Sequence, residues 1–324
     1  MKELLKVKNL KTYFYRPDGI VKAVDGISYT LNSGETLGIV GESGSGKSVS
    51  VLSLVKLLRG RAKIENGEAI FNGKDLLKLD KEELRAIRGK DISMIFQDPM
   101  TNLNPTHKIG FQIREPILWH KLMKNAEASE RARELLRRVG IPGHHKRFFD
   151  YPFQFSGGMR QRVMIAMALA CKPKLLIADE PTTALDVTIR SQILNLLQEM
   201  KEELKMSVIL ITHDFGIASN FCDNIIVMYA GRIMESAHIK EFITNPLHPY
   251  SLGLLGSILD IDFTKGNLKQ IPGNPPNLID LPEGCRFYPR CERRKKTCLT
   301  EPELKEVAPQ HYVACSIVQQ EIKK

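Results

Sequence analysis

The sequence predicts an α/β fold built on a parallel sheet, followed by a loop-rich C-terminal segment. A short apolar run, Leu37–Val40, ends at a glycine-rich loop, and a segment with helical apolar spacing follows it. Over residues 174–230, apolar runs alternate with helix-length segments, which implies parallel strands joined by crossover helices. Nine prolines between residues 246 and 309 exclude long helices from the C-terminal segment.

The N-terminal elements are delimited by turn signals. Residues 4–40 have the texture of short strands, with a turn at Pro17-Asp18-Gly19. The spacing from Ser48 to Leu58 predicts a helix. Residues 63–98 return to strands and turns, and Asn66-Gly67 and Asn72-Gly73 are hairpin signals.

The middle of the chain is richer in helix formers. The segment Glu127–Val139 has apolar residues on one side and charges on the other, which indicates an amphipathic helix. We expect a helical subdomain over about residues 99–170, inserted into a domain that spans residues 1–240. Residues 241–324 then form a C-terminal extension.

Composition leaves several classes of partner open. The chain has 324 residues, 43% hydrophobic and 26% charged, which is ordinary for a globular protein. The net charge of +10 is compatible with nucleic acid, an anionic membrane face or nucleotides, and it cannot choose among them. No apolar run approaches the ~20 residues that span a bilayer, and the N-terminus does not resemble a signal peptide. We therefore expect a cytoplasmic protein that reaches any membrane through a partner.

Residues 41–48 read Gly-Glu-Ser-Gly-Ser-Gly-Lys-Ser and fit the phosphate-loop pattern G-x-x-x-x-G-K-S. Glycines let successive backbone N–H groups surround phosphate oxygens, and the following helix directs its positive end at the same anion. Lys47 is expected to reach the β and γ phosphates of ATP, and Ser48 to bind Mg²⁺. The expected nucleotide-binding residues of this segment are Gly41, Ser43, Gly44, Ser45, Gly46, Lys47, Ser48 and Val49.

A second apolar strand, Leu175–Ala178, ends in two carboxylates. Asp179 is placed to hold Mg²⁺, usually through a water molecule. Glu180 points differently and can accept a proton from the attacking water, so it is the predicted general base.

A third motif, Phe155–Arg162, contains a Ser156-Gly157-Gly158 turn that opens a helix and forms a second anion site. It resembles the signature motif of ATP-binding-cassette (ABC) ATPases, with Phe155 for the usual leucine and Met159 for the usual glutamine. The resemblance implies a P-loop ABC nucleotide-binding domain, in which an antiparallel β part and a helical subdomain accompany the parallel core sheet.

Other family motifs follow in the same order. Gln97 resembles the Q-loop glutamine, a ligand of Mg²⁺ and water that also senses the membrane subunit. Asp186, in Ala184-Leu185-Asp186, resembles the D-loop, and His213 resembles the switch histidine that touches the γ-phosphate. A single glutamine or histidine at a strand end is usually only structural, and the order of the motifs is what favours the functional interpretation.

The family stacks one aromatic residue on adenine before the phosphate loop. Phe14 aligns best with that position and Tyr13 is the second candidate. The alternative is that both rings are strand core residues.

The resemblance also implies a dimer. In this family the phosphate loop of one subunit and the signature turn of the other close on one ATP, so Ser156 and Gly158 would contact the nucleotide of the opposite chain. ATP would close the pair and hydrolysis would reopen it. The helical subdomain would contact a transmembrane partner, with Asp98–Pro105 as a candidate contact.

The C-terminal segment indicates which subgroup of the family the chain resembles. Asn245–Tyr250, Ile271–Leu278 and Leu281–Cys291 resemble the ATPases of oligopeptide/dipeptide importers. The resemblance implies ATP-driven import of dipeptides or oligopeptides at the cytoplasmic face of the cell membrane; nickel or another small solute is the alternative cargo. The implied partners are two transmembrane permease subunits, a second ABC ATPase in a heterodimer and, indirectly, an extracytoplasmic solute-binding protein.

The rival class is a soluble ABC ATPase that acts on nucleic acid, which the basic run Arg290–Lys296 would suit. Members of that class carry two cassettes or long insertions, and neither is present in this sequence. We interpret the run as a solvated face, or one near anionic lipid, and expect no nucleic-acid partner.

Six cysteines divide into two groups. Cys171 and Cys222 have apolar surroundings and are expected to be inert core residues. The others, Cys285, Cys291, Cys298 and Cys315, crowd into the last 40 residues, where metal binding is favoured over disulfides in a reducing compartment. Their wide, uneven spacing favours an iron–sulfur cluster over zinc, although no metal is a third possibility. The importer resemblance implies a structural [4Fe-4S] cluster.

Overall fold

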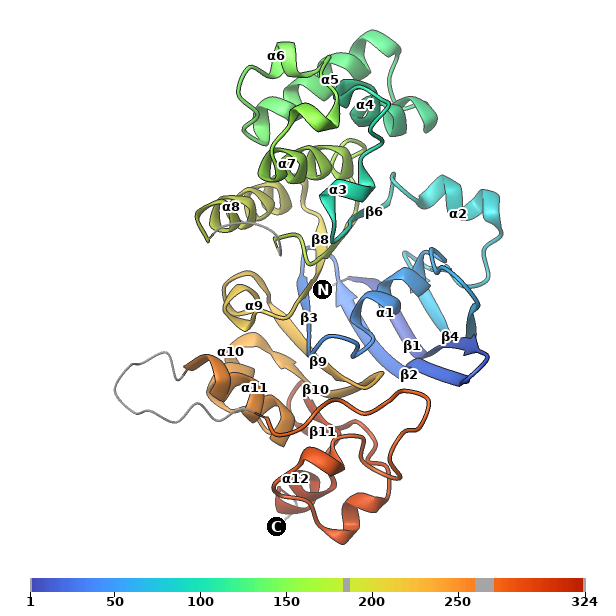
Figure 1. Ribbon diagram of the computed structural model, residues 1–324, viewed down its shortest axis with the longest axis vertical. Coiled ribbons are helices and arrows are strands. Elements are labelled where there is room, and N and C mark those ends of the chain that lie inside the picture. Colours follow the sequence, from blue (N-terminus) through green and yellow to red (C-terminus); the bar gives the residue numbers. More distant parts are fainter. Residues whose placement is uncertain (1, 183–186, 260–270, 323–324) are drawn as a thin grey trace. The chain divides into compact units, whose positions relative to one another are not determined.

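The computed structural model describes residues 2–182, 187–259 and 271–322 (Figure 1). The chain forms two compact units, one from residues 1–78 and 210–324 and the other from residues 79–209. Strand β8 (Ser207–Thr212) carries the chain from the second unit back to the first. Within the described ranges, no helix is both long and apolar enough to cross a membrane.

The first unit contains two sheets and several short helices. Its strands are β1 (Glu3–Arg16), β2 (Gly19–Asn32), β3 (Thr36–Val40), β4 (Ala62–Phe71), β5 (Lys74–Asp75), β9 (Asn224–Tyr229), β10 (Arg232–His238), β11 (Lys305–Ala308) and β12 (His311–Val313). Its helices are α1 (Lys47–Leu54), α9 (Phe215–Phe221), α10 (Ile239–Thr244), α11 (Pro249–Leu259), η2 (Tyr288–Arg290), η3 (Lys296–Leu299) and α12 (Ser316–Glu321).

One sheet of this unit is antiparallel, with the order β2-β1-β4-β5. The predicted turn at Pro17-Asp18 joins β1 to β2, and the predicted turn at Asn72-Gly73 joins β4 to β5, so both are confirmed. The strands β1 and β2 are longer than expected, at 14 residues each. Together they position the aromatic residues Tyr13 and Phe14 near the ends of the first hairpin.

The hairpin predicted at Asn66-Gly67 is wrong, because β4 runs through these residues. Asn9 and Leu10 of β1 lie opposite the single residue Gly67, between the paired positions on either side. Two residues facing one is a β-bulge, and Asn9 has the positive φ of 44° that this distortion requires. The Asn-Gly pair therefore marks a distortion within a strand and not the end of one.

In the other sheet of the first unit, the strands follow the order β11-β12-β10-β9-β3. Strand β3 pairs parallel with β9, as the predicted α/β fold requires, and every residue of β3 is buried. An apolar strand covered on both faces is typical of parallel sheets. The phosphate loop follows β3, and α1 follows the loop. This helix ends at Leu54, four residues before the predicted end, since Lys56 adopts a left-handed φ of 46° that breaks the helical path.

The second unit is mainly helical. Its elements are α2 (Lys81–Ile87), β6 (Ile92–Ile95), α3 (Pro99–Asn102), α4 (Ile109–Trp119), α5 (Asn125–Arg138), α6 (His144–Arg147), η1 (Pro152–Gln154), α7 (Gly157–Ala168), β7 (Leu175–Asp179) and α8 (Val187–Leu204). Strands β6 and β7 are parallel, and the helices α3 to α7 lie between them in the chain (Figure 1). On α5 the side chains of Ala132, Leu135 and Leu136 are buried as the sequence pattern predicts. That apolar face explains why this segment is a stable helix.

A buried carboxylate anchors the C-terminal region of the first unit. Glu235 on β10 is fully buried and accepts hydrogen bonds from the backbone N–H groups of Leu247 (2.9 Å) and His248 (2.8 Å). Its Oε1 also lies 2.7 Å from Nε2 of His311 on β12. These bonds satisfy a carboxylate that would otherwise be costly to bury, and they tie the chain after α10 to the sheet.

The buried imidazole of His248 predicts a pH-dependent stability. Its Nδ1 accepts a hydrogen bond from the Tyr250 N–H at 3.0 Å, and burial lowers the pKa of His248 from 6.5 to about 4, although Glu235 opposes the shift. Between these values the unfolded chain binds more protons than the folded one. The free energy of unfolding should therefore fall by a few kcal/mol as the pH is lowered from about 6.5 to about 4, at about 1.4 kcal/mol per pKa unit.

Urea unfolding at several pH values checks this. His248→Asn should be less stable at pH 7 and should lose less further stability on acidification, because the titrating group is gone. His145→Asn, at an exposed histidine of α6, is the matched control and should keep the wild-type slope. Equal slopes for wild type and His248→Asn would contradict the assignment.

Candidate functional site

The phosphate loop of the first unit is held by close backbone packing. Gly41 has a φ of 148°, and a Cβ there would lie 2.1 Å from the carbonyl oxygen of Met228. Gly46, which precedes α1 with a φ of 99°, would place a Cβ 2.2 Å from the carbonyl oxygen of Ala23. No side chain fits at either position, so the glycines let the loop lie against β9 and β2. The glycines therefore fix the backbone path of the loop, as a phosphate-binding loop requires.

Lys47 is 6% exposed, and its Nζ donates hydrogen bonds to the carbonyl oxygens of Gly41 at 2.7 Å and Glu42 at 2.9 Å. The ammonium group is therefore held over the loop by the loop's own backbone. Ser45 contributes further order, since its carbonyl oxygen accepts from the Gly231 N–H at 2.9 Å. The loop places a fixed positive charge beside the N-terminus of α1.

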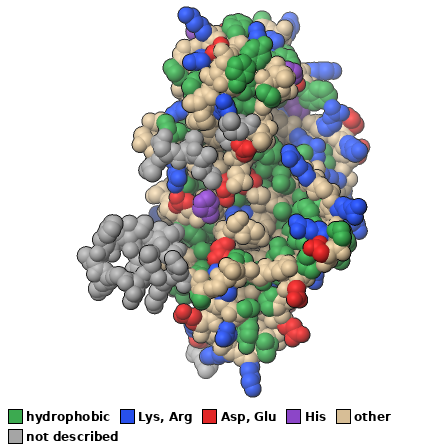
Figure 2. Space-filling view, in the orientation of Figure 1, with side chains coloured by type: hydrophobic (Ala, Val, Ile, Leu, Met, Phe, Trp, Pro, Cys, Tyr) green, Lys and Arg blue, Asp and Glu red, His purple; other side chains and the backbone are tan. Residues whose placement is uncertain are grey.

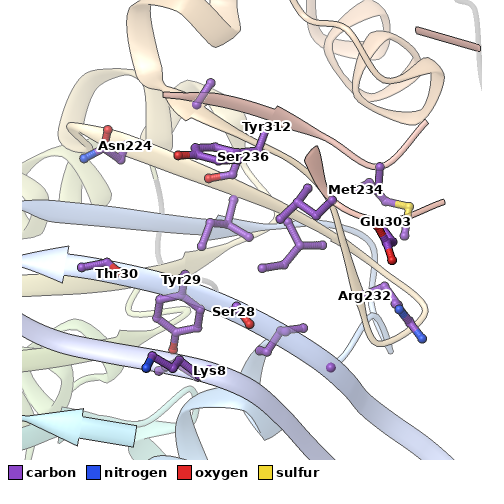
Figure 3. Close-up of a pocket in the computed structure, with 18 of the residues that line it drawn as sticks. Lys8, Ser28, Tyr29, Thr30, Asn224, Arg232, Met234, Ser236, Glu303 and Tyr312 are labelled. Carbon is purple, nitrogen blue, oxygen red and sulfur yellow. The ribbon is translucent and has the colours of Figure 1, made fainter. Parts of the chain in front are cut away.

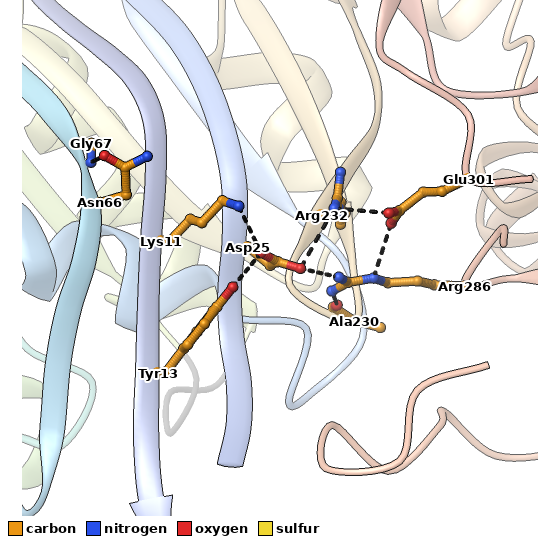
Figure 4. A network of polar contacts seen from close by, with 9 residues as sticks. All are labelled: Lys11, Tyr13, Asp25, Asn66, Gly67, Ala230, Arg232, Arg286 and Glu301. Carbon is orange, nitrogen blue, oxygen red and sulfur yellow. Dashed lines mark hydrogen bonds and ion pairs between the residues drawn. The ribbon is translucent and has the colours of Figure 1, made fainter. Parts of the chain in front are cut away.

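The two aromatic candidates lie on β1, and both are partly buried. The Tyr13 hydroxyl donates to Oδ1 of Asp25 at 2.6 Å, so the ring orientation of Tyr13 is fixed from β2 (Figure 4). Phe14 pairs with Val21 of β2 and Ala62 of β4. Which ring stacks on adenine stays a prediction.

Asp25 is the centre of a buried ionic network (Figure 4). Arg286 from the C-terminal region pairs with its Oδ2, and Arg232 lies 3.5 Å from the same oxygen. Both arginines also pair with Glu301, Arg232 at 3.0 Å and Arg286 at 3.6 Å. Burial opposes ionisation of Asp25, but the bond from Tyr13 and the cations of Arg286 and Arg232 hold the pKa of its carboxyl below its ordinary value.

His213 belongs to the first unit and follows β8 directly, with an exposed side chain. The next residue, Asp214, caps α9 by accepting from the Ile217 N–H at 3.2 Å. The turn between β8 and α9 thus places His213 at the carboxyl end of a buried strand, where polar groups of α/β folds bind ligands.

In the second unit the structure brings two predicted residues together. Gln97, just after β6, donates from Nε2 to Oε2 of Glu180, just after β7, at 2.8 Å. This bond leaves the Gln97 carbonyl oxygen as the group that can ligate a metal ion or water. Asp179, the last residue of β7, is 5% exposed, whereas Glu180 is half-buried with a left-handed φ of 47°. The two neighbouring carboxylates therefore have different environments and can carry different roles.

The signature turn opens α7 in the same unit. Ser156 is the N-cap, and its hydroxyl accepts from the Met159 N–H at 3.4 Å. Ser156 and Gly157 are exposed, so the turn presents a helix N-terminus to solvent. Phe155, which stands where the family has leucine, is buried at 3% exposure and anchors the turn. The predicted D-loop residue Asp186 lies outside the described residues.

The prediction of a [4Fe-4S] cluster is wrong, and its zinc alternative has no site either. Within the part of the chain that the structure describes, no group of three or more histidine, cysteine, aspartate or glutamate side chains is arranged to hold a metal ion. The four C-terminal cysteines do gather around one small cavity, but Cys298 and Cys315 pack as core with Val313, Ile317 and Val318, and Cys285 packs against this core. Burial raises the pKa of Cys285 to about 12 and also raises the pKa values of Cys291 and Cys315, so the neutral thiol is favoured. The cysteines therefore act as small apolar side chains in the packing of this region.

Of the remaining two cysteines, only Cys222 is the core residue that was expected, because Cys171 is partly exposed. Cys222 is buried in the core, and burial raises the pKa of Cys171 to about 11. The neutral thiol is therefore favoured at Cys171, as expected of an inert cysteine.

The interpretation of the basic run as a solvated face is wrong for its first two residues, Arg290 and Cys291, which are buried. Residues 292–297 are exposed, but Arg290 is 8% exposed and pairs with Glu42 of the phosphate loop at 2.7 Å. Sequence reasoning missed both partners, because Glu42 occupies a variable position of the loop motif and the two residues are 248 positions apart.

A cavity of about 660 Å³ in the first unit is a different feature from the loop (Figure 3). It is lined by residues of β1, β2, β9 and β10 and by the C-terminal region, including Tyr29, Arg232 and Tyr312. None of the loop residues 41–49 lines it. Its size therefore does not identify it as the nucleotide site.

A glycine-rich phosphate loop after a buried parallel strand, together with paired carboxylates at the end of another, defines a P-loop nucleoside triphosphatase. Comparison with known proteins narrows this class. The family model described as ABC transporter matches residues 24–183, and the model described as oligopeptide/dipeptide transporter, C-terminal region, matches residues 234–298.

Individual relatives match nearly the whole chain. The oligopeptide transport ATP-binding protein OppD of Salmonella typhimurium is 51% identical over 312 residues, which cover 96% of this chain and 93% of the relative. The dipeptide transport ATP-binding protein DppD of Lactococcus lactis is 49% identical over 316 residues, with 96% and 89% covered. The dimeric, post-hydrolysis structure of the ATP-binding cassette MJ0796, bound to ADP and Pi, matches with a TM-score of 0.66 and 31% identity over 73% of this chain and 99% of that chain.

The chain therefore belongs to the ATP-binding proteins of ABC transporters, in the group that carries the oligopeptide/dipeptide transporter C-terminal region. It is an ATPase with the ABC nucleotide-binding fold, so the predicted family, fold class and enzyme activity are confirmed. The domain boundary near residue 240 stays a prediction.

Proposed function

We propose that this chain is the ATP-hydrolysing subunit of an importer of dipeptides or oligopeptides. The observation that carries the proposal is the match to oligopeptide and dipeptide transport ATP-binding proteins over 96% of the chain, the C-terminal region included. As a subunit without a spanning helix in its described part, it would act with two transmembrane permease subunits, peripherally at the cytoplasmic face of the cell membrane. A solute-binding protein outside the membrane would deliver the peptide.

For ATP binding, we assign the phosphates to the loop residues Gly41–Val49. The backbone N–H groups and Lys47 supply positive electrostatic potential, and water is excluded from Lys47 by its burial. Phe14 or Tyr13 would stack on adenine. The closely packed loop supports this assignment, because contacts with β9 and β2 restrict its backbone to one path.

For Mg²⁺, the candidate ligands are Ser48, Gln97 and Asp179. Each offers an oxygen atom, the donor that Mg²⁺ prefers, and the Gln97 amide is oriented by its bond to Glu180. The bound ion would neutralise charge on the β and γ phosphates. The donor set therefore fits the metal that accompanies ATP.

For hydrolysis, Glu180 would accept a proton from the attacking water and His213 would contact the γ-phosphate. The bond from Gln97 keeps the Glu180 carboxylate oriented, which supports its assignment as the base. Ser156, Gly157 and Gly158 would reach the nucleotide of a second ABC subunit, with Asp186 at the same interface. The solvent-exposed helix N-terminus at Ser156 is suited to such an anion.

The contact with the permease would come from the helical part of the second unit, including Asp98–Pro105. Large apolar side chains are exposed there, and hydrophobic side chains reach the surface over these helices in Figure 2. They are Phe111 (37% exposed), Trp119 (58%), Leu122 (41%), Phe149 (54%) and Phe153 (68%). Exposed aromatic side chains are enriched at protein interfaces.

Lys47→Ala should abolish productive ATP binding, because it removes the buried cation that the loop holds for the phosphates. Fluorescent-nucleotide binding and phosphate release measure this. Lys74→Ala, at an exposed lysine of β5, is the control and should behave like wild type. Normal turnover in Lys47→Ala would refute the assignment of the loop.

Glu180→Gln should reduce ATP hydrolysis by ~10²–10⁴-fold, the usual contribution of a general base, and should leave ATP binding intact. The amide keeps the size of the side chain and a partner for Gln97. Glu199→Gln, exposed on α8, is the control. Wild-type turnover in Glu180→Gln would exclude Glu180 as the base.

Transport itself is tested by reconstituting the chain with its permease and second ATPase in liposomes. Uptake of a labelled dipeptide or oligopeptide should require ATP and should stop with Glu180→Gln in this chain. ATP hydrolysis that is stimulated by the solute-binding protein loaded with another solute, and not with peptides, would overturn the peptide assignment while leaving the ATPase intact.

A further inference from the structure

The C-terminal region meets the phosphate loop at Glu42, the second residue of the loop. Its carboxylate accepts two hydrogen bonds from Arg290, at 2.7 Å from one guanidinium nitrogen and 3.1 Å from the other. Its backbone N–H donates to the Tyr250 hydroxyl at 3.0 Å, and its carbonyl oxygen accepts from Lys47 at 2.9 Å. Glu42 therefore joins three partners, two of them from beyond residue 240.

Arg290 is itself held in place. It is 8% exposed, its Nε donates to the carbonyl oxygen of Pro272 at 2.8 Å, and one guanidinium nitrogen lies 3.3 Å from the Tyr229 hydroxyl. The guanidinium also lies over the rings of Tyr229, at 5.7 Å, and Phe287, at 6.0 Å. A planar guanidinium fixed on two aromatic rings presents its fork to the carboxylate in one orientation.

The aromatic residues around Arg290 form a continuous cluster with Tyr250. The ring centroids of Tyr229 and Tyr250 are 4.6 Å apart, and each lies 5.3 Å from that of Phe287. The two groups that hold Glu42, the Tyr250 hydroxyl and the Arg290 guanidinium, are therefore parts of one packed body. Motion of Glu42 would have to disrupt the cluster or break a charge-assisted pair whose cation is buried.

The same segment holds the nucleotide region at a second point. Arg286, four residues before Arg290, pairs with Asp25, which in turn fixes the hydroxyl of Tyr13 (Figure 4). Pro275 and Pro276 of the C-terminal region line a small space with Ser43, Gly44 and Ser45. The C-terminal region thus contacts the loop at Glu42 and lies beside Ser43–Ser45. The Arg290–Glu42 pair is a charged contact with the loop itself.

We propose that Arg290 is a positioning residue of the ATP site, which acts through Glu42 to hold the phosphate loop and Lys47 in the conformation that accepts ATP. The proposal rests on the role proposed for the loop. Without the pair, Glu42 is released and the loop populates other conformations. The apparent ATP affinity is then the intrinsic affinity multiplied by the fraction of molecules whose loop still accepts ATP.

Arg290→Gln in the full chain, assembled with its transporter partners, tests the proposal. KM for ATP should rise on the order of tenfold with little change in kcat, since the lost ordering affects binding and not the chemical step. Arg293→Gln is the matched control, because Arg293 lies in the same segment and pairs through two 2.8 Å bonds with Glu321, away from the loop. Its KM should stay at the wild-type value.

A double-mutant cycle separates positioning from general stability. Glu42→Gln should raise KM as Arg290→Gln does, and the double variant should lose no more than either single variant, because both changes break one contact. Arg290→Lys keeps the charge without the fork, so its KM should lie between those of wild type and Arg290→Gln. If Arg290→Gln does not fold, Glu42→Gln and Arg290→Lys decide the test, with KM measured well below the melting temperature of each variant.

Additive effects in the cycle, or Arg290→Gln with the same KM as Arg293→Gln, would overturn the proposal. A wild-type transporter that does not hydrolyse ATP would count instead against the proposed function. The two failures are therefore distinguishable.

Discussion

The close backbone packing of the phosphate loop is the constraint on which the rest of the first unit depends. Gly41 lies against the backbone of β9 and Gly46 against that of β2, at distances that leave no room for a side chain. The loop can therefore exist only where both strands are already in place. This requirement links two sheets of different topology, one antiparallel and one partly parallel, through the six residues of irregular backbone between β3 and α1. Lys47 completes the arrangement, since its ammonium bonds to the loop that it follows.

In the described part of the C-terminal region, the cysteines form no metal site, and other contacts attach the region to the rest of the unit. Its cysteines supply small apolar surface, and the specific contacts come from buried charges. Glu235 binds two backbone N–H groups and His311, Arg286 pairs with Asp25, and Arg290 pairs with Glu42. Paired charges with several hydrogen bonds each fix one arrangement, because any shift leaves a buried group unsatisfied. Buried charges thus attach the C-terminal region specifically to the sheet and the loop.

The second unit shows how neighbouring carboxylates gain different roles. Asp179 ends a buried strand, whereas Glu180 has left the strand with a positive φ and meets Gln97. The change of backbone direction at Glu180 therefore leaves the Asp179 carboxylate buried and brings the Glu180 carboxylate to the Gln97 amide. The parallel pairing of β6 with β7 is what places Gln97 beside Glu180, since both residues follow the carboxyl ends of adjacent strands.

Local sequence patterns alone determined the phosphate loop, the strand–loop–helix around it, the amphipathic α5 and the order of the family motifs. These features depend on residues close together in the chain, so spacing and periodicity suffice to find them. The tertiary structure alone decided three others: that Asn66-Gly67 lies within β4 opposite a bulge of β1, that the C-terminal cysteines line an apolar core, and that Arg290 is a buried partner of Glu42. Each depends on which residues pack together in the folded chain. A partner up to 248 positions away does not affect the local sequence pattern, so the pattern cannot reveal it.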